Sequence, residues 1–404
     1  MKRKLHRSRR SVFGRRGMHP ALKTLLWIVA CVAVVALGYF GAMVISEGKL
    51  PEIEIEVGGN QSADVNKPDS TPNTDKEPND DTQNGGSAVT PPADKPVATA
   101  EGIRAFYLPS SALSVDTLME TSTLQDAAAA GFNAVVFDLK DADGTMYYRF
   151  NSAQAKKVNS YAPNALSADN LTALFDLMKD NGLQPIPRLY AFCDDLAAKV
   201  LTDARIGLDS NHSWAWYDGD PNNGGKKWLN PYAPAAQDYV SALVGELKTK
   251  GAAAVMLDGV QFPSQLSSAY LGEDAATVEK NAVLTAFVGR IRNELGADCP
   301  LLLGCSEKGA LGTDTKIYGG NPLTFGADFA SPVLSSKIQD SIEKMILRTQ
   351  VLDEKPTLAP MLKTIGLTAE QVSDAIAACV KGGAKDFILF DHEGYYEFSA
   401  YDLP

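Results

Sequence analysis

Residues 252–264 read AAAVMLDGVQFPS and contain the clearest strand of the chain. The small and apolar residues before Asp258 are typical of a strand that is buried on both faces. In a barrel of parallel strands, the carboxyl ends of the strands carry the chemistry. Asp258 is therefore a candidate for catalysis or ligand binding. The alternative is an aspartate that caps the turn at Gly259.

The same pattern recurs along the chain. Residues 133–140 (NAVVFDLK) place Asp138 near the end of an apolar run, and residues 386–393 (DFILFDHE) place Asp391 there. Segments of helical character that close in glycine precede several such runs, as expected where a helix ends and leads into a strand. The sequence therefore predicts alternating strands and helices.

Eight runs of this kind are expected to form strands: residues 102–108, 132–138, 184–190, 253–258, 300–304, 327–333, 356–362 and 386–391. Amphipathic segments of helical length separate most of them, among them residues 171–182, 235–251, 277–296 and 369–383. Eight such units in about 300 residues predict a (β/α)8 barrel of the TIM type. A doubly wound open sheet is the alternative, but the glycine-rich phosphate loop that usually follows its first strand is missing.

The N-terminal part predicts a membrane anchor. Residues 1–23 carry nine Lys or Arg and no acid, and residues 24–46 carry no charge. At about 1.5 Å per residue, the uncharged stretch is long enough to cross a hydrocarbon core of about 30 Å. We expect a basic cytoplasmic tail, one uncleaved transmembrane helix in the cell membrane, and an extracellular chain after it. A cleaved signal peptide and twin-arginine export are the alternatives.

Two further segments follow the anchor. Residues 47–100 are rich in Pro, Asp, Asn, Thr, Ser and Gly, so we expect a disordered extracellular linker. Residues 101–404 are expected to form the barrel domain. Because nine positive charges lie in residues 1–23 and the whole chain has a net charge of −11, the rest carries about −20. Such a surface does not suit nucleic acid.

The cysteines give no sign of a metal site. They are scattered without C-x-x-C spacing, at Cys31, Cys193, Cys299, Cys305 and Cys379. We therefore expect no metal and no cofactor, and the sequence leaves both disulfide pairing and oligomeric state open.

Four motifs carry a resemblance to a known family: NAVVFDLKDADGTMYY (133–148), LQPIPRLYAF (183–192), WLNPYAPAAQDY (228–239) and VMLDGVQFPS (255–264). Through them the chain resembles a bacterial surface family described as "putative glycosyl hydrolase", itself distantly similar to α-amylase-type barrels. The resemblance covers nearly all of residues 102–393. It implies a (β/α)8 barrel that acts on polysaccharide or descends from enzymes that do. Gly259 and Gln261 replace an aromatic and a basic residue of the family pattern, so the substrate cleft is expected to be altered.

Glycoside hydrolysis requires two carboxyl groups across the scissile bond. Asp258 and Glu307 follow the fourth and fifth expected strands, where the α-amylase type holds its nucleophile and its acid. The alternative for Glu307 is a surface pair with Lys308. Asp391 closes the eighth strand and is a third catalytic candidate.

Arg188 lies within an otherwise apolar strand, and a buried guanidinium is costly without acceptors. We expect Asp138 or Asp258 to pair with it, in a substrate-binding role or as a structural ion pair. Residues 141–144 (DADG), after Asp138, are expected to form a turn. Its residues Asp141 and Asp143, and Lys140 before it, are expected to be solvated.

Sugar rings stack on aromatic side chains, and one long loop gathers four of them. Trp214, Trp216, Tyr217 and Trp228 all fall between the third and fourth expected strands. They are candidate substrate-binding residues, because long loops of this kind are frequently functional. The alternative is a small core beneath the loop.

The sequence thus predicts a membrane-anchored extracellular glycoside hydrolase whose partner is a cell-wall glycan or environmental polysaccharide. The alternative is an inactive, glycan-binding barrel that tethers or senses the envelope. A metal-dependent deacetylase is disfavoured, because His212 and His392 are the only histidines after the anchor.

Overall fold

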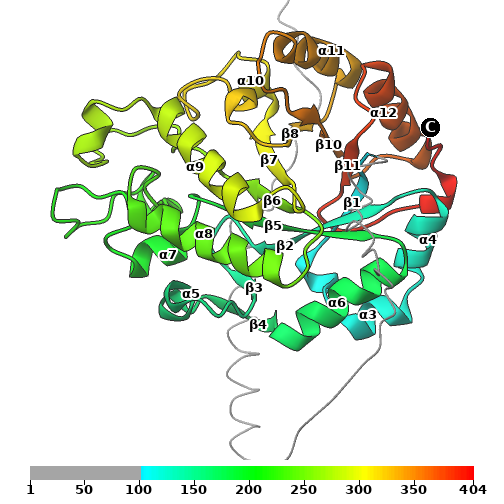
Figure 1. Cartoon of the computed structure of the whole chain (residues 1–404), viewed down its shortest axis with the longest axis horizontal. Coiled ribbons are helices and arrows are strands. Elements are labelled where there is room, and N and C mark those ends of the chain that lie inside the picture. The colour runs from blue at the N-terminus through cyan, green and yellow to red at the C-terminus, as the bar shows by residue number, and fades with distance from the viewer. Residues whose placement is uncertain (1–101) are drawn as a thin grey trace, which may run out of the picture. The chain divides into compact units, whose positions relative to one another are not determined.

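A computed structural model of the protein describes residues 102–404, in which eight parallel strands close into a barrel (Figure 1). The strands are β1 (Arg104–Leu108), β2 (Ala134–Lys140), β5 (Gln184–Tyr190), β6 (Val255–Asp258), β7 (Leu301–Ser306), β8 (Phe329–Leu334), β10 (Met361–Lys363) and β11 (Phe387–Phe390). Each pairs in parallel with the next, and β11 pairs with β1, which closes the ring. The predicted (β/α)8 barrel is confirmed.

Helices form the outer layer around the strands (Figure 1). They are α3 (Val115–Glu120), α4 (Thr123–Ala129), α5 (Ala153–Val158), α6 (Ala168–Asp180), α7 (Asp195–Val200), α8 (Pro234–Thr249), α9 (Lys280–Leu295), α10 (Glu307–Ala310), α11 (Ile338–Thr349) and α12 (Ala369–Lys381). Local sequence explains several helix starts. Ser167 caps α6, and Thr368 and Gln371 form a reciprocal capping box at the start of α12.

The seventh expected strand differs most from the structure. Residues 356–362 form two short pieces, β9 (Thr357–Leu358) and β10, and both pair with β8. Pro360 lies between them and lacks the N–H that a continuous ladder requires. The helix α11, between β8 and β9, is not among the helical segments named from the sequence, and the one α-helix between β7 and β8 is the four-residue α10.

A small extension widens the sheet beside β2. The strand β3 (Met146–Tyr148) pairs antiparallel with β2, and β4 (Tyr161–Leu166) pairs with β3. The chain therefore makes this excursion, which includes α5, before it returns to the barrel through α6.

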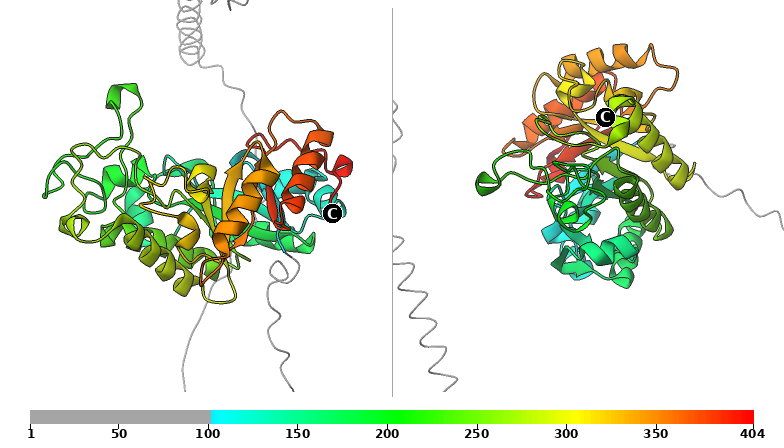
Figure 2. Two further views of the ribbon diagram at one scale, coloured as in Figure 1. Left: turned by 90° about the horizontal axis from the view of Figure 1, so that it is seen from above. Right: turned by 90° about the vertical axis from the view of Figure 1, so that its left-hand side faces the viewer.

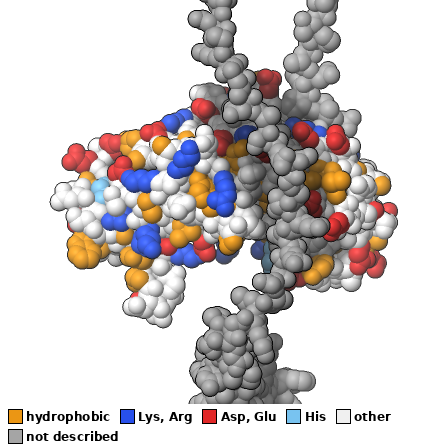
Figure 3. Space-filling view, turned by 90° about the horizontal axis from the view of Figure 1, so that it is seen from below, with side chains coloured by type: hydrophobic (Ala, Val, Ile, Leu, Met, Phe, Trp, Pro, Cys, Tyr) orange, Lys and Arg blue, Asp and Glu red, His pale blue; other side chains and the backbone are white. Residues whose placement is uncertain are grey.

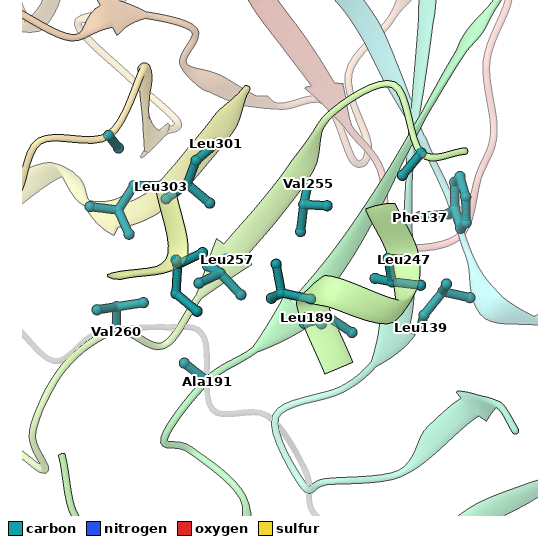
Figure 4. Close-up of a cluster of buried hydrophobic side chains, with 14 of the residues drawn as sticks. Phe137, Leu139, Leu189, Ala191, Leu247, Val255, Leu257, Val260, Leu301 and Leu303 are labelled. Carbon is teal, nitrogen blue, oxygen red and sulfur yellow. The ribbon is translucent and has the colours of Figure 1, made fainter. Parts of the chain in front are cut away.

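The core has two parts because successive strand residues point to opposite faces of the sheet. One set fills the barrel interior and includes Ala105, Val136, Met256 and Ile388. The larger set lies between the strands and the helices. Figure 4 shows a part of it, with side chains from β2, β5, β6 and β7 and Leu247 of α8.

Two long loops extend from the barrel on the same side, at the left of Figure 1 and of the left view in Figure 2. One joins α7 to α8 and the other joins β6 to α9, and a bridge between Gly207 and Tyr270 connects them. The face in Figure 3 carries both acidic and basic side chains, with apolar ones scattered between them.

The predicted tail, transmembrane segment and linker, residues 1–100, lie outside the described residues. From residue 102 onward, no helix combines the length and the apolar character needed to span a membrane.

Candidate functional site

Arg188 is the centre of a charged cluster at the carboxyl ends of β2, β5 and β6. Its Nε lies 2.5 Å from Asp138 Oδ1, and its Nη2 donates to Asp138 Oδ2 at 3.0 Å. The two residues face each other in register on neighbouring strands. Because both oxygens of one carboxylate are engaged by one guanidinium, the pair has the bidentate geometry that makes such contacts strong and specific.

Asp258 is held more loosely by the same arginine. Its Oδ2 lies 3.5 Å from Arg188 Nη1, and its side chain is 18% exposed. The N–H of Gly259 donates to Asp258 Oδ1 at 2.8 Å. Gly259 has a φ of +63°, a conformation that favours glycine. Arg188 thus contacts both of its predicted partners, Asp138 tightly and Asp258 weakly.

Aromatic rings enclose the guanidinium of Arg188. Its Cζ lies 5.1 Å from the ring centroid of Tyr107 and 5.2 Å from those of Tyr190 and Phe390. The Tyr107 hydroxyl also donates to Asp138 Oδ2 at 2.9 Å. These rings exclude water from the cluster and interact with the cation through their faces. These three residues were not among the predicted site residues, although each occupies an inward-facing position near the end of its strand.

The pKa values follow from this environment. Burial raises the pKa of Asp258, while Arg188 and the Gly259 N–H partly offset this and the Asp138 carboxylate adds to it. Burial opposes the charge of Arg188, but the attraction of Asp138 and Asp258 leaves its pKa raised. The positive charge of Arg188 therefore mainly neutralises Asp138. It offsets the cost of burying the charge of Asp258 less completely.

Glu307, the second predicted catalytic residue, is the first residue of α10, directly after β7. It is half-buried, and its Oε1 accepts a hydrogen bond of 2.5 Å from Ser341 Oγ on α11. Asp258 and Glu307 thus follow neighbouring strands, as expected. Glu307 has no ion pair with Lys308.

Asp391, the third candidate, is buried in the turn that follows β11. The N–H of Glu393 donates to its Oδ1 at 2.8 Å, and its own N–H donates to the Tyr396 hydroxyl. It has no ion pair with Arg188; instead it lines a separate cavity, described below.

Residues 105–303 match a family model described as "Putative glycosyl hydrolase domain". Over these residues the chain is similar to this family. No curated protein matches the chain.

Several solved structures are similar to this chain. A hypothetical protein from Ruminiclostridium thermocellum has 22% identity, over 49% of this chain and 96% of that one, with a TM-score of 0.41. An α-galactosidase from Thermus thermophilus has 15% identity, over 74% of this chain and 60% of that one, with a TM-score of 0.47. The glycoside hydrolase domain of a PelA variant from Pseudomonas aeruginosa has 12% identity, over 72% of this chain and 96% of that one, with a TM-score of 0.41. The similarity to glycosyl hydrolases rests on the family model alone.

The four aromatic residues of the long loop lie in different environments within this domain. Trp216 and Trp228 are buried with Ile206 in a small core, and each indole N–H is bonded within the loop region, to Ser267 O and Asp218 Oδ2. Trp216 and Trp228 therefore form a small core beneath the loop, which was the alternative to a role in substrate binding. Trp214 is 70% exposed, and the half-buried ring of Tyr217 lies under the ammonium group of Lys227.

One expectation about this domain was wrong. Lys140, predicted as a solvated turn residue, is fully buried with its Nζ 2.8 Å from Asp194 Oδ2. A register shift between Asp138 and Lys140 turns the lysine toward the helix layer, where it faces the Tyr239 ring of α8. Burial raises the pKa of Asp194, and Lys140 partly offsets this.

In residues 102–404, no group of three or more His, Cys, Asp or Glu side chains is arranged to hold a metal ion. The four cysteines of this part are all free thiols.

Proposed function

We propose that this protein is a membrane-anchored extracellular glycoside hydrolase that cleaves cell-wall or environmental polysaccharide, with Asp258 as its principal catalytic carboxylate. The position of Asp258 carries the proposal: it ends a barrel strand, keeps part of its side chain in contact with solvent, and lies beside the buried cation of Arg188. The similarity to the family model supports the reaction class.

In the proposed mechanism, Glu307 is the general acid, and Asp258 is the nucleophile or the general base. Glu307 gives its proton to the glycosidic oxygen as the bond to the leaving sugar breaks. Asp258, ionised, attacks the anomeric carbon or removes a proton from the attacking water. The Arg188 guanidinium favours this ionised form against the burial that disfavours it. Asp138 and the aromatic rings hold Arg188 in position, so we assign them a positioning role.

One observation favours a second function, that of a glycan-binding barrel without turnover. Glu307 Oε1 is engaged by Ser341 of α11, which draws this carboxylate toward the helix layer. If the bond persists when glycan is bound, the second catalytic group is missing.

The experiment that separates the two functions uses the purified full-length chain. We expect new reducing ends when it is incubated with a panel of purified glycans and cell-wall preparations, and none when Asp258→Asn replaces it. Binding to a glycan without release of reducing ends from either protein supports the glycan-binding function.

The proposed location rests on the sequence alone, on the basic residues 1–23 and the uncharged residues 24–46. Protease added to intact cells is expected to release the barrel by cutting within residues 47–100. A barrel that stays protected until the cells are lysed contradicts this location.

A further inference from the structure

A cavity lies between the start of α12, the loop after β10 and the segment after β11. Its volume is about 430 Å³, within the range of small-molecule sites. In Figure 1 these segments lie together near the C-terminus. Residues that line it include Thr364, Asp391, Glu393, Tyr395 and Glu397.

The cavity has a strongly one-sided charge. Three carboxyl groups line it, those of Asp391, Glu393 and Glu397, and no Lys, Arg or His does. Asp391 is only 4% exposed, yet within residues 102–404 no basic side chain lies at ion-pair distance from it. Two other buried acids, Asp138 and Asp194, each have such a partner, whereas Asp386 has none and accepts a hydrogen bond from the N–H of Ile103. A buried carboxylate without a cation is costly, so this cavity favours a positively charged ligand.

Two uncharged groups add to this preference. Thr364 is 4% exposed, and its Oγ1 has no hydrogen-bond partner among the described residues. Buried hydroxyl groups are usually bonded, so this one is available to a ligand. Tyr395 is 75% exposed and offers an aromatic face at the cavity. Such a face attracts both a cation and the apolar side of a sugar ring.

A metal ion does not fit this arrangement. The three carboxyl groups do not converge, since no cluster of three or more possible ligands occurs in residues 102–404. Spread over a cavity of this size, they suit an organic ammonium group on a larger ligand.

The cavity is connected to the charged cluster through one residue, Tyr107. Its carbonyl oxygen accepts a hydrogen bond of 2.9 Å from the Tyr396 hydroxyl, beside the cavity, while its own hydroxyl donates to Asp138. Because β6 and β11 stand on opposite sides of the ring, a glycan bound at Asp258 would reach the cavity by extending across the barrel mouth.

We propose that this cavity is a subsite for an amino sugar, a hexosamine unit whose amino group is free and protonated. The ammonium group would bind Asp391, with Glu393 and Glu397 completing its negative surroundings. The Thr364 hydroxyl would bond a sugar hydroxyl, and Tyr395 would cover one face of the ring. This proposal rests on the proposed function, because it names the class of glycan on which the enzyme acts.

The test compares two ligands that differ in one group. Equilibrium binding to the full-length chain is measured at pH 6 for glucosamine oligomers and for N-acetylglucosamine oligomers of equal length, with each ligand confirmed intact afterwards. We expect the oligomer with free amines to bind about tenfold more tightly, because only it carries the positive charge. We expect added salt to reduce the difference.

Three variants place the preference at the cavity. Asp391→Asn is expected to abolish it, and the exposed substitutions Glu393→Gln and Glu397→Gln to reduce it without affecting folding. Asp298→Asn is the matched control, since it removes an exposed carboxylate before β7, at the opposite end of the barrel. Equal affinity for both oligomers, or a preference that all three cavity variants retain, would overturn the proposal.

The outcome is separable from that of the proposed function. Cleavage of neutral glycans without any preference for free amines removes this subsite but leaves the hydrolase in place. A preference for free amines without any cleavage leaves the subsite and removes the hydrolase.

Discussion

The carboxylate of Asp258 lies directly against the backbone of Gly304. A methyl group on Gly304 would be 2.8 Å from Asp258 Cγ and 3.0 Å from each carboxylate oxygen, closer than such atoms normally approach. Gly304 belongs to β7, the neighbour of the strand that Asp258 ends. Because Gly304 has no side chain, β7 leaves the space that the Asp258 carboxylate of β6 occupies.

Gly304→Ala is expected to displace Asp258. We expect turnover to fall about 100-fold, because a shift of about 1 Å in a reacting group has effects of this size. Stability should fall by about 1–3 kcal/mol from the overpacking. Steady-state kinetics and denaturant unfolding measure the two effects.

The control for this substitution is a double variant. In the Asp258→Ala background the added methyl meets no carboxylate, so Gly304→Ala should then cost little stability. An equal cost in both backgrounds contradicts the steric argument.

Asp138 and Asp258 are expected to differ in their effect on stability. Asp138→Asn removes the bidentate partner of buried Arg188 and should reduce the free energy of unfolding by on the order of 3 kcal/mol. Asp258→Asn removes only a 3.5 Å contact and should cost much less at pH 7. Chemical denaturation of both variants measures the difference, and equal losses contradict the assignment of Asp138 as the main partner.

The pH dependence of the same comparison follows from the raised pKa of Asp258. Because the pKa of Asp258 is higher in the folded than in the unfolded protein, protonated Asp258 contributes to the stability of the fold. This contribution is complete below the pKa of an unfolded aspartate and is lost as the pH rises through the pKa of Asp258 in the folded protein. Relative to wild type, Asp258→Asn should therefore gain stability as the pH rises through that window. A relative loss over the same window would show that the ionised form is the favoured one. Thermal unfolding between pH 3 and pH 7 measures this trend.

The long loop allows a paired test of exposed and buried tryptophan. Trp214→Ala should weaken glycan binding by about 1–3 kcal/mol and leave the melting temperature nearly unchanged, because Trp214 is exposed. Trp216→Ala should instead destabilise the protein by about 3–5 kcal/mol, because it empties a core position. Calorimetry and glycan titration separate the two, and a large stability loss in Trp214→Ala contradicts the account.

The sequence predicted those features that depend on local pattern. Apolar runs that end in an acid located the barrel strands, and Arg188 within such a run required a nearby carboxylate. Residues whose role depends on contacts between distant segments were harder to predict. Phe390 reaches Arg188 only because β11 closes the ring onto β1, and Trp216 is buried only because residues near Leu266 and Leu271 fold over it. The prediction for Lys140 was wrong because a one-residue shift in register after Asp138 moves a side chain from one face of the strand to the other.

The most direct test of the central claim is a paired measurement on wild type and Asp258→Asn, turnover on a cleaved glycan together with thermal unfolding. The account predicts that turnover falls by several orders of magnitude while glycan affinity and folding persist, since the substitution keeps the shape of the side chain and removes the charge that the transition state requires. Full turnover combined with lowered stability would contradict it and make Asp258 a structural partner of Arg188.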